Sequence, residues 1–117
     1  MNRRHRLTRT RDFQYTYRRG VRMHINGMLI SFTLSPFPRE PRLGIVVSRK
    51  IGNAVVRNRF KRRVRACFDR VRSSFRLVFD LIVMARTPAA ALLTVDAIEQ
   101  SVWDVFLQRP RFEAPQS

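Results

Sequence analysis

Acidic residues are scarce in this sequence of 117 residues. It contains 8 Asp and Glu against 24 Lys and Arg, and its formal net charge is +16 at pH 7. Since so few acids cannot neutralise that charge, we expect a polyanionic partner. Flexible basic tails contain few large apolar residues, whereas 44% of this chain is hydrophobic and 10% is aromatic. The charge therefore belongs to one folded domain, residues 1–117, with an expected ordered core at about residues 6–107.

Cysteine and histidine are nearly absent. Cys67 is the only cysteine, which excludes an intrachain disulfide. Together with His5 and His24 it cannot complete a Cys/His zinc site, and we assign no metal ligand. We expect both histidines on the surface or in contact with nucleic acid rather than acting as catalytic bases.

Long apolar runs and nucleotide motifs are missing as well. No stretch approaches the roughly 18 apolar residues that cross a bilayer. The Arg-rich start leads to Asp12 and not to the apolar segment of a signal peptide. We therefore expect a cytoplasmic protein that does not contact membranes. The phosphate-binding pattern Gly-x-x-x-x-Gly-Lys-Ser/Thr is absent, so no nucleotide cofactor is expected.

The few acids are also scattered along the chain. A nuclease that acts through its own side chains needs carboxylates to hold divalent metals, or paired histidines for acid and base catalysis. Neither arrangement is visible, and Asp96, Glu99 and Asp104 fit ordinary positions on an amphipathic helix. We therefore predict no catalytic side chain in the protein.

The hydrophobic pattern predicts an α+β fold. Helices are expected at residues 10–19, at 54–72 and after Thr94, and strands at 27–35, 42–48 and 78–86. This order predicts a small two-layer sandwich, in which helices pack on a sheet of three to four strands. The alternation in 27–35 predicts one core face and one open face. If the strands that flank 54–72 are parallel neighbours, the general rule predicts a right-handed crossover.

Aromatic residues occupy two of the predicted helices. Phe13 and Tyr17 lie one turn apart, and they could either pack in the core or stack on the bases of a single-stranded nucleic acid. Trp103 and Phe106 have no basic residue close by in the sequence, so we place them in the core.

Positive charge concentrates around the predicted helix at 54–72. Residues 49–76 contain 11 basic residues and one acid, Asp69. One helix face is apolar and consists of Val56, Phe60, Val64, Cys67 and Val71. The charged residues repel one another unless counter-charge is supplied, so a polyanion-binding face is favoured over a merely solvated one.

Residues 50–65 closely resemble the protein subunit of bacterial ribonuclease P. The resemblance is carried by Arg57, Asn58 and Arg59, which follow a Lys-x-Gly-x-Ala segment that starts at Lys50. It extends in the same order and spacing over about residues 6–107. The matching segments include Asp12-Phe13, Arg42-Leu43-Gly44 and residues 80–86.

This resemblance implies a basic protein cofactor of a ribozyme. In the family, the RNA subunit removes the 5′ leader from precursor tRNA, and the protein binds both that catalytic RNA and the leader. The implied enzyme is a ribonucleoprotein endoribonuclease, whose Mg²⁺ is held mainly by the RNA. The alternative is a basic structural RNA-binding protein of the ribosomal kind, with no role in cleavage.

The resemblance also implies two sets of binding residues. The set expected to face the RNA subunit is Arg57, Asn58, Arg59, Lys61, Arg62 and Arg65. The set expected to line a leader cleft between the first helix and the sheet is Phe13, Tyr17, Ser31, Arg49 and Lys50. Tyr17 stands where Phe is common in the family, and Ser31 stands where some members have Tyr. The family further implies a left-handed crossover around the basic helix, against the general rule.

Overall fold

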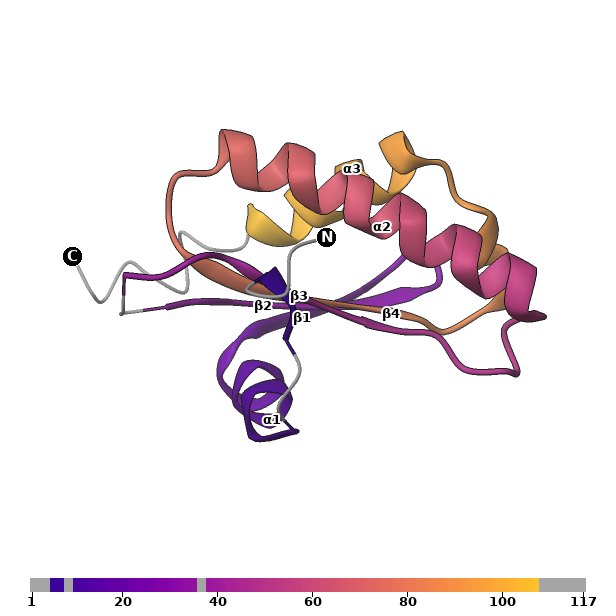
Figure 1. Ribbon diagram of the computed structural model, residues 1–117, viewed down its shortest axis with the longest axis horizontal. Coiled ribbons are helices and arrows are strands. Elements are labelled where there is room, and N and C mark those ends of the chain that lie inside the picture. Colours follow the sequence, from indigo (N-terminus) through magenta and orange to yellow (C-terminus); the bar gives the residue numbers. More distant parts are fainter. Residues whose placement is uncertain (1–4, 8–9, 36–37, 108–117) are drawn as a thin grey trace.

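The computed structural model describes residues 5–7, 10–35 and 38–107 and has an α+β fold built on one sheet (Figure 1). The elements follow the chain as α1 (Thr10–Arg19), β1 (Val21–Ile25), β2 (Met28–Leu34), β3 (Arg42–Val46), α2 (Ala54–Ser74), β4 (Phe79–Ala85), the 3₁₀ helix η2 (Pro88–Leu92) and α3 (Val95–Phe106). The predicted fold class is confirmed, and the sheet has four strands.

The sheet has the strand order β1-β2-β4-β3. Strands β1, β2 and β4 pair antiparallel, whereas β3 pairs parallel with β4. The connection between these parallel neighbours contains α2, as the sequence predicts, and its hand stays a prediction. Helices α2 and α3 cover one face of the sheet, and α1 lies on the other face (Figure 1).

Strand β1 was not predicted from the sequence, although its turn is recognisable. Asn26 and Gly27 both have positive φ, 51° and 76°, as a two-residue type I′ hairpin requires. Arg22 and His24 are exposed, while Val21, Met23 and Ile25, which alternate with them, are half-buried against the core. This short edge strand was missed because polar residues occupy its alternate positions.

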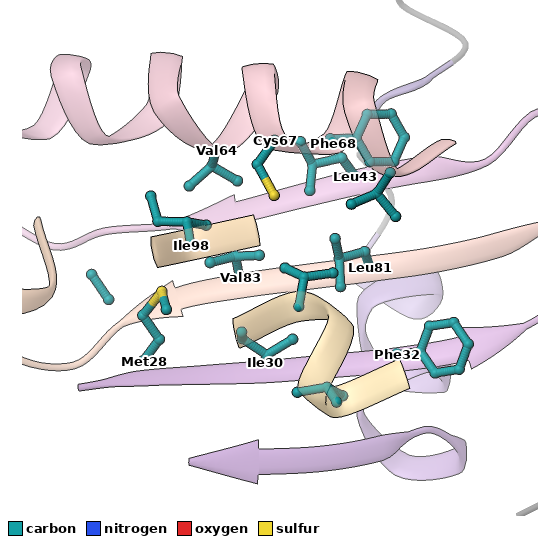
Figure 2. Packing of buried hydrophobic residues seen from close by; sticks show 14 of the residues in the cluster. Met28, Ile30, Phe32, Leu43, Val64, Cys67, Phe68, Leu81, Val83 and Ile98 are labelled. Atoms are coloured by element: carbon teal, nitrogen blue, oxygen red, sulfur yellow. The ribbon is translucent and has the colours of Figure 1, made fainter. Parts of the chain in front are cut away.

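The core lies between the sheet and the layer of α2 and α3. Figure 2 shows Val64, Cys67 and Phe68 of α2 above Leu43, Leu81 and Val83 of the strands, with Ile98 of α3 in the same layer. The predicted apolar face of α2 is confirmed, and it also includes Phe68. Burial raises the pKa of the Cys67 thiol to about 12, so this thiol remains protonated inside the fold.

Caps and aromatic contacts fix the helices of this layer. Asn53 caps α2 by accepting a hydrogen bond from the Val56 amide at 3.0 Å. Thr94 caps α3 in the same way, as predicted. Phe106 is buried with its ring centroid 4.1 Å from that of Phe32, and the half-buried Trp103 packs beside it. The predicted core placement of Trp103 and Phe106 is confirmed.

The prediction of an open second face for residues 27–35 is wrong. Leu29, Ser31 and Thr33 on that face are all buried. The alternation identifies two faces of a strand, but it does not reveal that α1 packs on the second one (Figure 1).

His5 is also not on the surface as expected. Its ring is buried, lies edge-on to Phe68 and is 3.1 Å from the Pro41 carbonyl oxygen. The physical reason is that residues 5–7 run along the outer edge of β3, where the Leu7 amide donates to the Leu43 carbonyl at 2.9 Å. His24 is exposed, as predicted.

Candidate nucleic-acid interface

Helix α1 crosses the sheet from β3 to β1. Residues paired across the strands form one row on this face: Gly44, Ile82, Ser31 and Arg22. At the β3 end, the Phe13 ring lies directly over Gly44. At the β1 end, the guanidinium carbon of Arg22 lies 4.4 Å from the centre of the Tyr17 ring. The two aromatic residues of α1 thus contact opposite ends of one row.

A charge network fixes α1 in this position. Arg42 of β3 donates to Asp12 of α1 at 3.1 Å and to Asp80 of β4 at 2.9 and 3.0 Å. Arg39 donates two further bonds to Asp80, whose side chain is only 3% exposed. The hydrogen bonds from Arg42 to Asp80 raise the pKa of Arg42, so this guanidinium stays charged.

The two aromatic residues differ in how much surface they leave open. Phe13 is half-buried because its ring packs on the glycine, while Tyr17 is 43% exposed. Phe13 therefore packs against the sheet, and Tyr17 presents a partly exposed ring with the Arg22 guanidinium over one of its faces. Both could offer ring surface to a base.

Ser31 is placed beneath these residues, with an exposed fraction of 1%. It is paired with Ile82 in the row that α1 crosses. Of the expected leader residues, Ser31 is the one whose side chain has no free surface in this structure.

Beyond α1, a second row of the same sheet face is more open. It consists of His24, Leu29, Met84 and Val46. His24 is exposed and Met84 and Val46 are half-exposed, while Arg86 places a guanidinium nitrogen 4.0 Å from the Met84 sulfur. These residues were not among the predicted ones. The alternation of β1 was the signal that could have found His24, whereas the continuous apolar run of β4 gave no such signal for Met84.

Arg49 and Lys50 lie farther along the same direction, in the loop between β3 and α2. Both are exposed. Arg49 follows Gly44 by five residues, which is at most about 17 Å of extended chain. No contact links either residue to Phe13 or Tyr17 among the described residues. The open row therefore separates the two halves of the expected leader set.

The residues expected to face the RNA subunit all belong to α2, which covers the sheet face opposite to α1 (Figure 1). Asn58, Arg59 and Arg62 are exposed. Arg57, Lys61 and Arg65 are half-buried at the flanks of the helix. We call these six residues the α2 basic face.

Helix α3 neutralises the far end of α2 but not this basic face. Arg70 pairs with Asp96 and Glu99 of α3 at 2.9 and 3.2 Å. Arg72 pairs at 3.1 Å with Asp69, which belongs to α2 itself. The hydrogen bonds to Asp96 and Glu99 raise the pKa of Arg70. No ion pair within the described residues involves the α2 basic face. Its charge is therefore available to an external anion.

Five of the seven described acids are held by arginines rather than gathered in a shared site. Asp12, Asp69, Asp80, Asp96 and Glu99 all form ion pairs with arginines. Within residues 5–7, 10–35 and 38–107, no three His, Cys, Asp or Glu side chains gather in a group that could hold a metal ion. In the same part of the chain, no helix has the length and apolarity to cross a membrane.

Comparison with known proteins decides the family. A family model described as Ribonuclease P matches residues 1–109. The chain belongs to the ribonuclease P protein family. A ribonuclease P protein component from Brevibacillus brevis is 39% identical over 105 residues, covering 90% of this chain and 82% of the relative. The family resemblance of the sequence is thereby confirmed.

Solved ribonuclease P proteins have the same fold. The Staphylococcus aureus RNase P protein superposes with a TM-score of 0.72 at 35% identity, covering 92% of this chain and 97% of that one. The Thermotoga maritima protein gives 0.68 at 28% identity, with coverage of 86% and 93%. The chain is thus a protein component of ribonuclease P, a tRNA-processing ribonucleoprotein.

Proposed function

We propose that the chain binds the catalytic RNA of ribonuclease P through the α2 basic face and the 5′ leader of precursor tRNA through the α1 side of the sheet. The observation that carries this proposal is the separation of the two surfaces. They lie on opposite faces of the sheet (Figure 1), so the protein can contact two RNA segments at once. The expected result is stronger binding of precursor tRNA by the assembled particle.

The α2 basic face suits the phosphates of a folded RNA. It has no acid partner within the described residues, whereas Arg70 and Arg72 on the same helix are paired. Arginine guanidinium groups bind phosphates through two parallel hydrogen bonds. Each phosphate contact releases counterions, so affinity falls as salt rises. The unpaired segment of α2 is therefore the preferred place for the RNA subunit.

The α1 side suits a single strand. Tyr17 and the exposed edge of Phe13 offer ring surface for unpaired bases, and Arg49 and Lys50 supply positive charge at the far end of the open row. Ser31 is buried below, and we assign it to the support of this surface. The open row lies between them along the sheet, where an extended strand would connect the two ends.

We assign the catalytic Mg²⁺ to the RNA subunit. Five of the seven described acids are held in ion pairs, and Asp80, the most buried of them, binds two guanidinium groups. These carboxylates are poor candidates for metal ligands, since binding a cation would displace arginines that fix the fold. The protein's own side chains thus bind and orient RNA, and Mg²⁺ supplies a Lewis acid for phosphodiester hydrolysis.

Direct binding measurements on two variants test this assignment. Arg59→Ala with Arg62→Ala should weaken binding of the RNA subunit and reduce the salt slope by about one to two. Phe13→Ala should weaken binding of leader-bearing precursor to the assembled particle, while binding of mature tRNA changes little.

Arg70→Ala with Arg72→Ala is the matched control for the basic face. It removes the same charge from the same helix, but at positions already paired with acids. A control variant that weakens RNA binding as much as the Arg59/Arg62 variant would reject the placement. Loss of the same ligand by the Phe13 and Arg59/Arg62 variants would reject the two separate surfaces.

A further inference from the structure

The outer face of α1 carries a second combination of aromatic and basic side chains. Arg11, Gln14, Tyr15, Arg18 and Arg19 follow helical spacing and are all exposed. They line an open hollow of about 290 Å³. The Tyr15 ring is 53% exposed, and the guanidinium carbon of Arg19 lies 6.0 Å from its centre. This face points away from the sheet, whereas Phe13 and Thr16 point toward it.

The charge of this face has no internal counterpart. The acid of α1, Asp12, lies on another side of the helix and is paired with Arg42. None of the ion pairs among the described residues includes Arg11, Arg18 or Arg19. The three guanidinium groups extend over about 12 Å of helix. They present a short line of positive charge on both sides of one aromatic ring.

Helix stability does not account for this arrangement. Arg18 and Arg19 lie in the last turn of α1, where positive charge is favourable. Arg11, by contrast, lies in the first turn, where the helix dipole disfavours a cation. An exposed tyrosine between these positions contributes nothing to the core. Binding of a ligand would explain why these basic side chains and the exposed tyrosine occur together on one face.

We infer that the outer face of α1 binds an unpaired RNA nucleotide, separate from both surfaces of the proposed function. The base stacks on Tyr15, and Arg11, Arg18 and Arg19 bind the phosphates on either side. Gln14 lines the same hollow, and its amide can hydrogen-bond the edge of the base. An unpaired nucleotide is required because a base within a duplex does not offer its face to an exposed ring.

The nucleotide can come from either of two RNAs, the RNA subunit or the precursor tRNA. Three binding measurements distinguish them: the protein with the RNA subunit, the assembled particle with leader-bearing precursor, and the particle with leaderless tRNA. Tyr15→Ala should weaken one of these by roughly five- to 150-fold, since stacking on a protein aromatic ring has that value per base. The affected measurement identifies the source.

Tyr15→Phe is the conservative variant. It keeps the ring, so its affinities should stay within about twofold of the unsubstituted protein. Leu77→Ala removes another exposed apolar side chain, on the loop before β4, and controls for nonspecific surface effects. Thermal unfolding of each variant verifies folding, which an exposed position should preserve.

Photocrosslinking provides a readout that does not need the assembled particle. A single-stranded RNA of about ten nucleotides with one 4-thiouridine should crosslink to Tyr15 itself, as located by fragmentation of the crosslinked peptide, and Phe13→Ala should leave that crosslink in place. Unchanged affinities for Tyr15→Ala in all three measurements, together with no crosslink at Tyr15, would overturn the inference. Equal losses for Tyr15→Phe and Tyr15→Ala would reject stacking. A change only in self-association would assign the face to a protein contact and would also overturn it.

Discussion

The ring of Phe13 covers Gly44 so closely that a Cβ atom at position 44 would lie 2.6 Å from the ring's Cζ atom. Real side chains do not tolerate that distance, so the ring and the glycine fit only as a pair. The contact sets the height of α1 above β3 and therefore the position of both α1 aromatic residues. Gly44 of the family motif is therefore needed because it lets the Phe13 side chain of α1 come close to the backbone of β3.

Gly44→Ala should destabilise the protein by about 1–3 kcal/mol, because the added methyl group must displace the Phe13 ring. Urea unfolding measures this cost. In a Phe13→Ala background the same substitution should cost clearly less, since the ring is gone. Equal costs in the two backgrounds would show that the ring does not limit position 44.

The network around Asp80 predicts a large loss of stability. Asp80→Asn should lower the free energy of unfolding by about 3 kcal/mol, because it leaves Arg39 and Arg42 facing a neutral, buried group. Asp69→Asn is the comparison, since it removes an exposed pair with Arg72 and should cost no more than about 0.5 kcal/mol. Similar losses for both variants would contradict the special role of the buried network.

Thr16 offers a substitution that should stabilise the fold. Thr16 belongs to α1, and its side chain is fully buried between this helix and the sheet. Its hydroxyl has no hydrogen-bond partner among the described residues. Thr16→Val replaces the hydroxyl with a methyl group of similar size and should raise the free energy of unfolding by up to about 1 kcal/mol. Thr16→Ser retains the hydroxyl, removes the methyl group and should destabilise. A destabilised Thr16→Val variant would mean that the hydroxyl is bonded in solution.

Cys67 predicts a loss of stability at alkaline pH. Burial raises the pKa of its thiol from the ordinary 9.0 to about 12. The unfolded chain then loses its thiol proton above pH 9 while the folded chain keeps it, so the contribution is complete below pH 9 and lost as pH rises toward 12. The slope is about 1.4 kcal/mol per pH unit. Cys67→Ala should lack this component, and identical pH profiles for both proteins would contradict it.

The sequence predicted the elements whose signals are local. Asn53 before a run of apolar residues at helical spacing is enough to place α2, and Thr94 does the same for α3. The hairpin at Asn26 and Gly27 had an equally local signal, but the polar residues of β1 outweighed it. Elements with a long continuous pattern are thus easier to predict than a short edge strand.

Contacts between elements that are distant in the sequence could not be predicted from the sequence alone. The alternation of β2 gave two faces, yet it did not show that α1 buries Ser31. The identical residue type at Arg62 and Arg70 gave no sign that Arg70 is paired with α3, while Arg62 forms no ion pair among the described residues. Such differences depend on which elements meet in space, and a single sequence does not specify that.

The most direct test of the account is single-turnover cleavage of a precursor tRNA with a 5′ leader at low Mg²⁺. The reactions contain the RNA subunit alone, the protein alone, or both. The account predicts rapid removal of the leader only when both are present, because the protein contributes binding and charge neutralisation and the RNA contributes catalysis. Cleavage by the protein alone, or a mixture no faster than the RNA subunit alone, would contradict it.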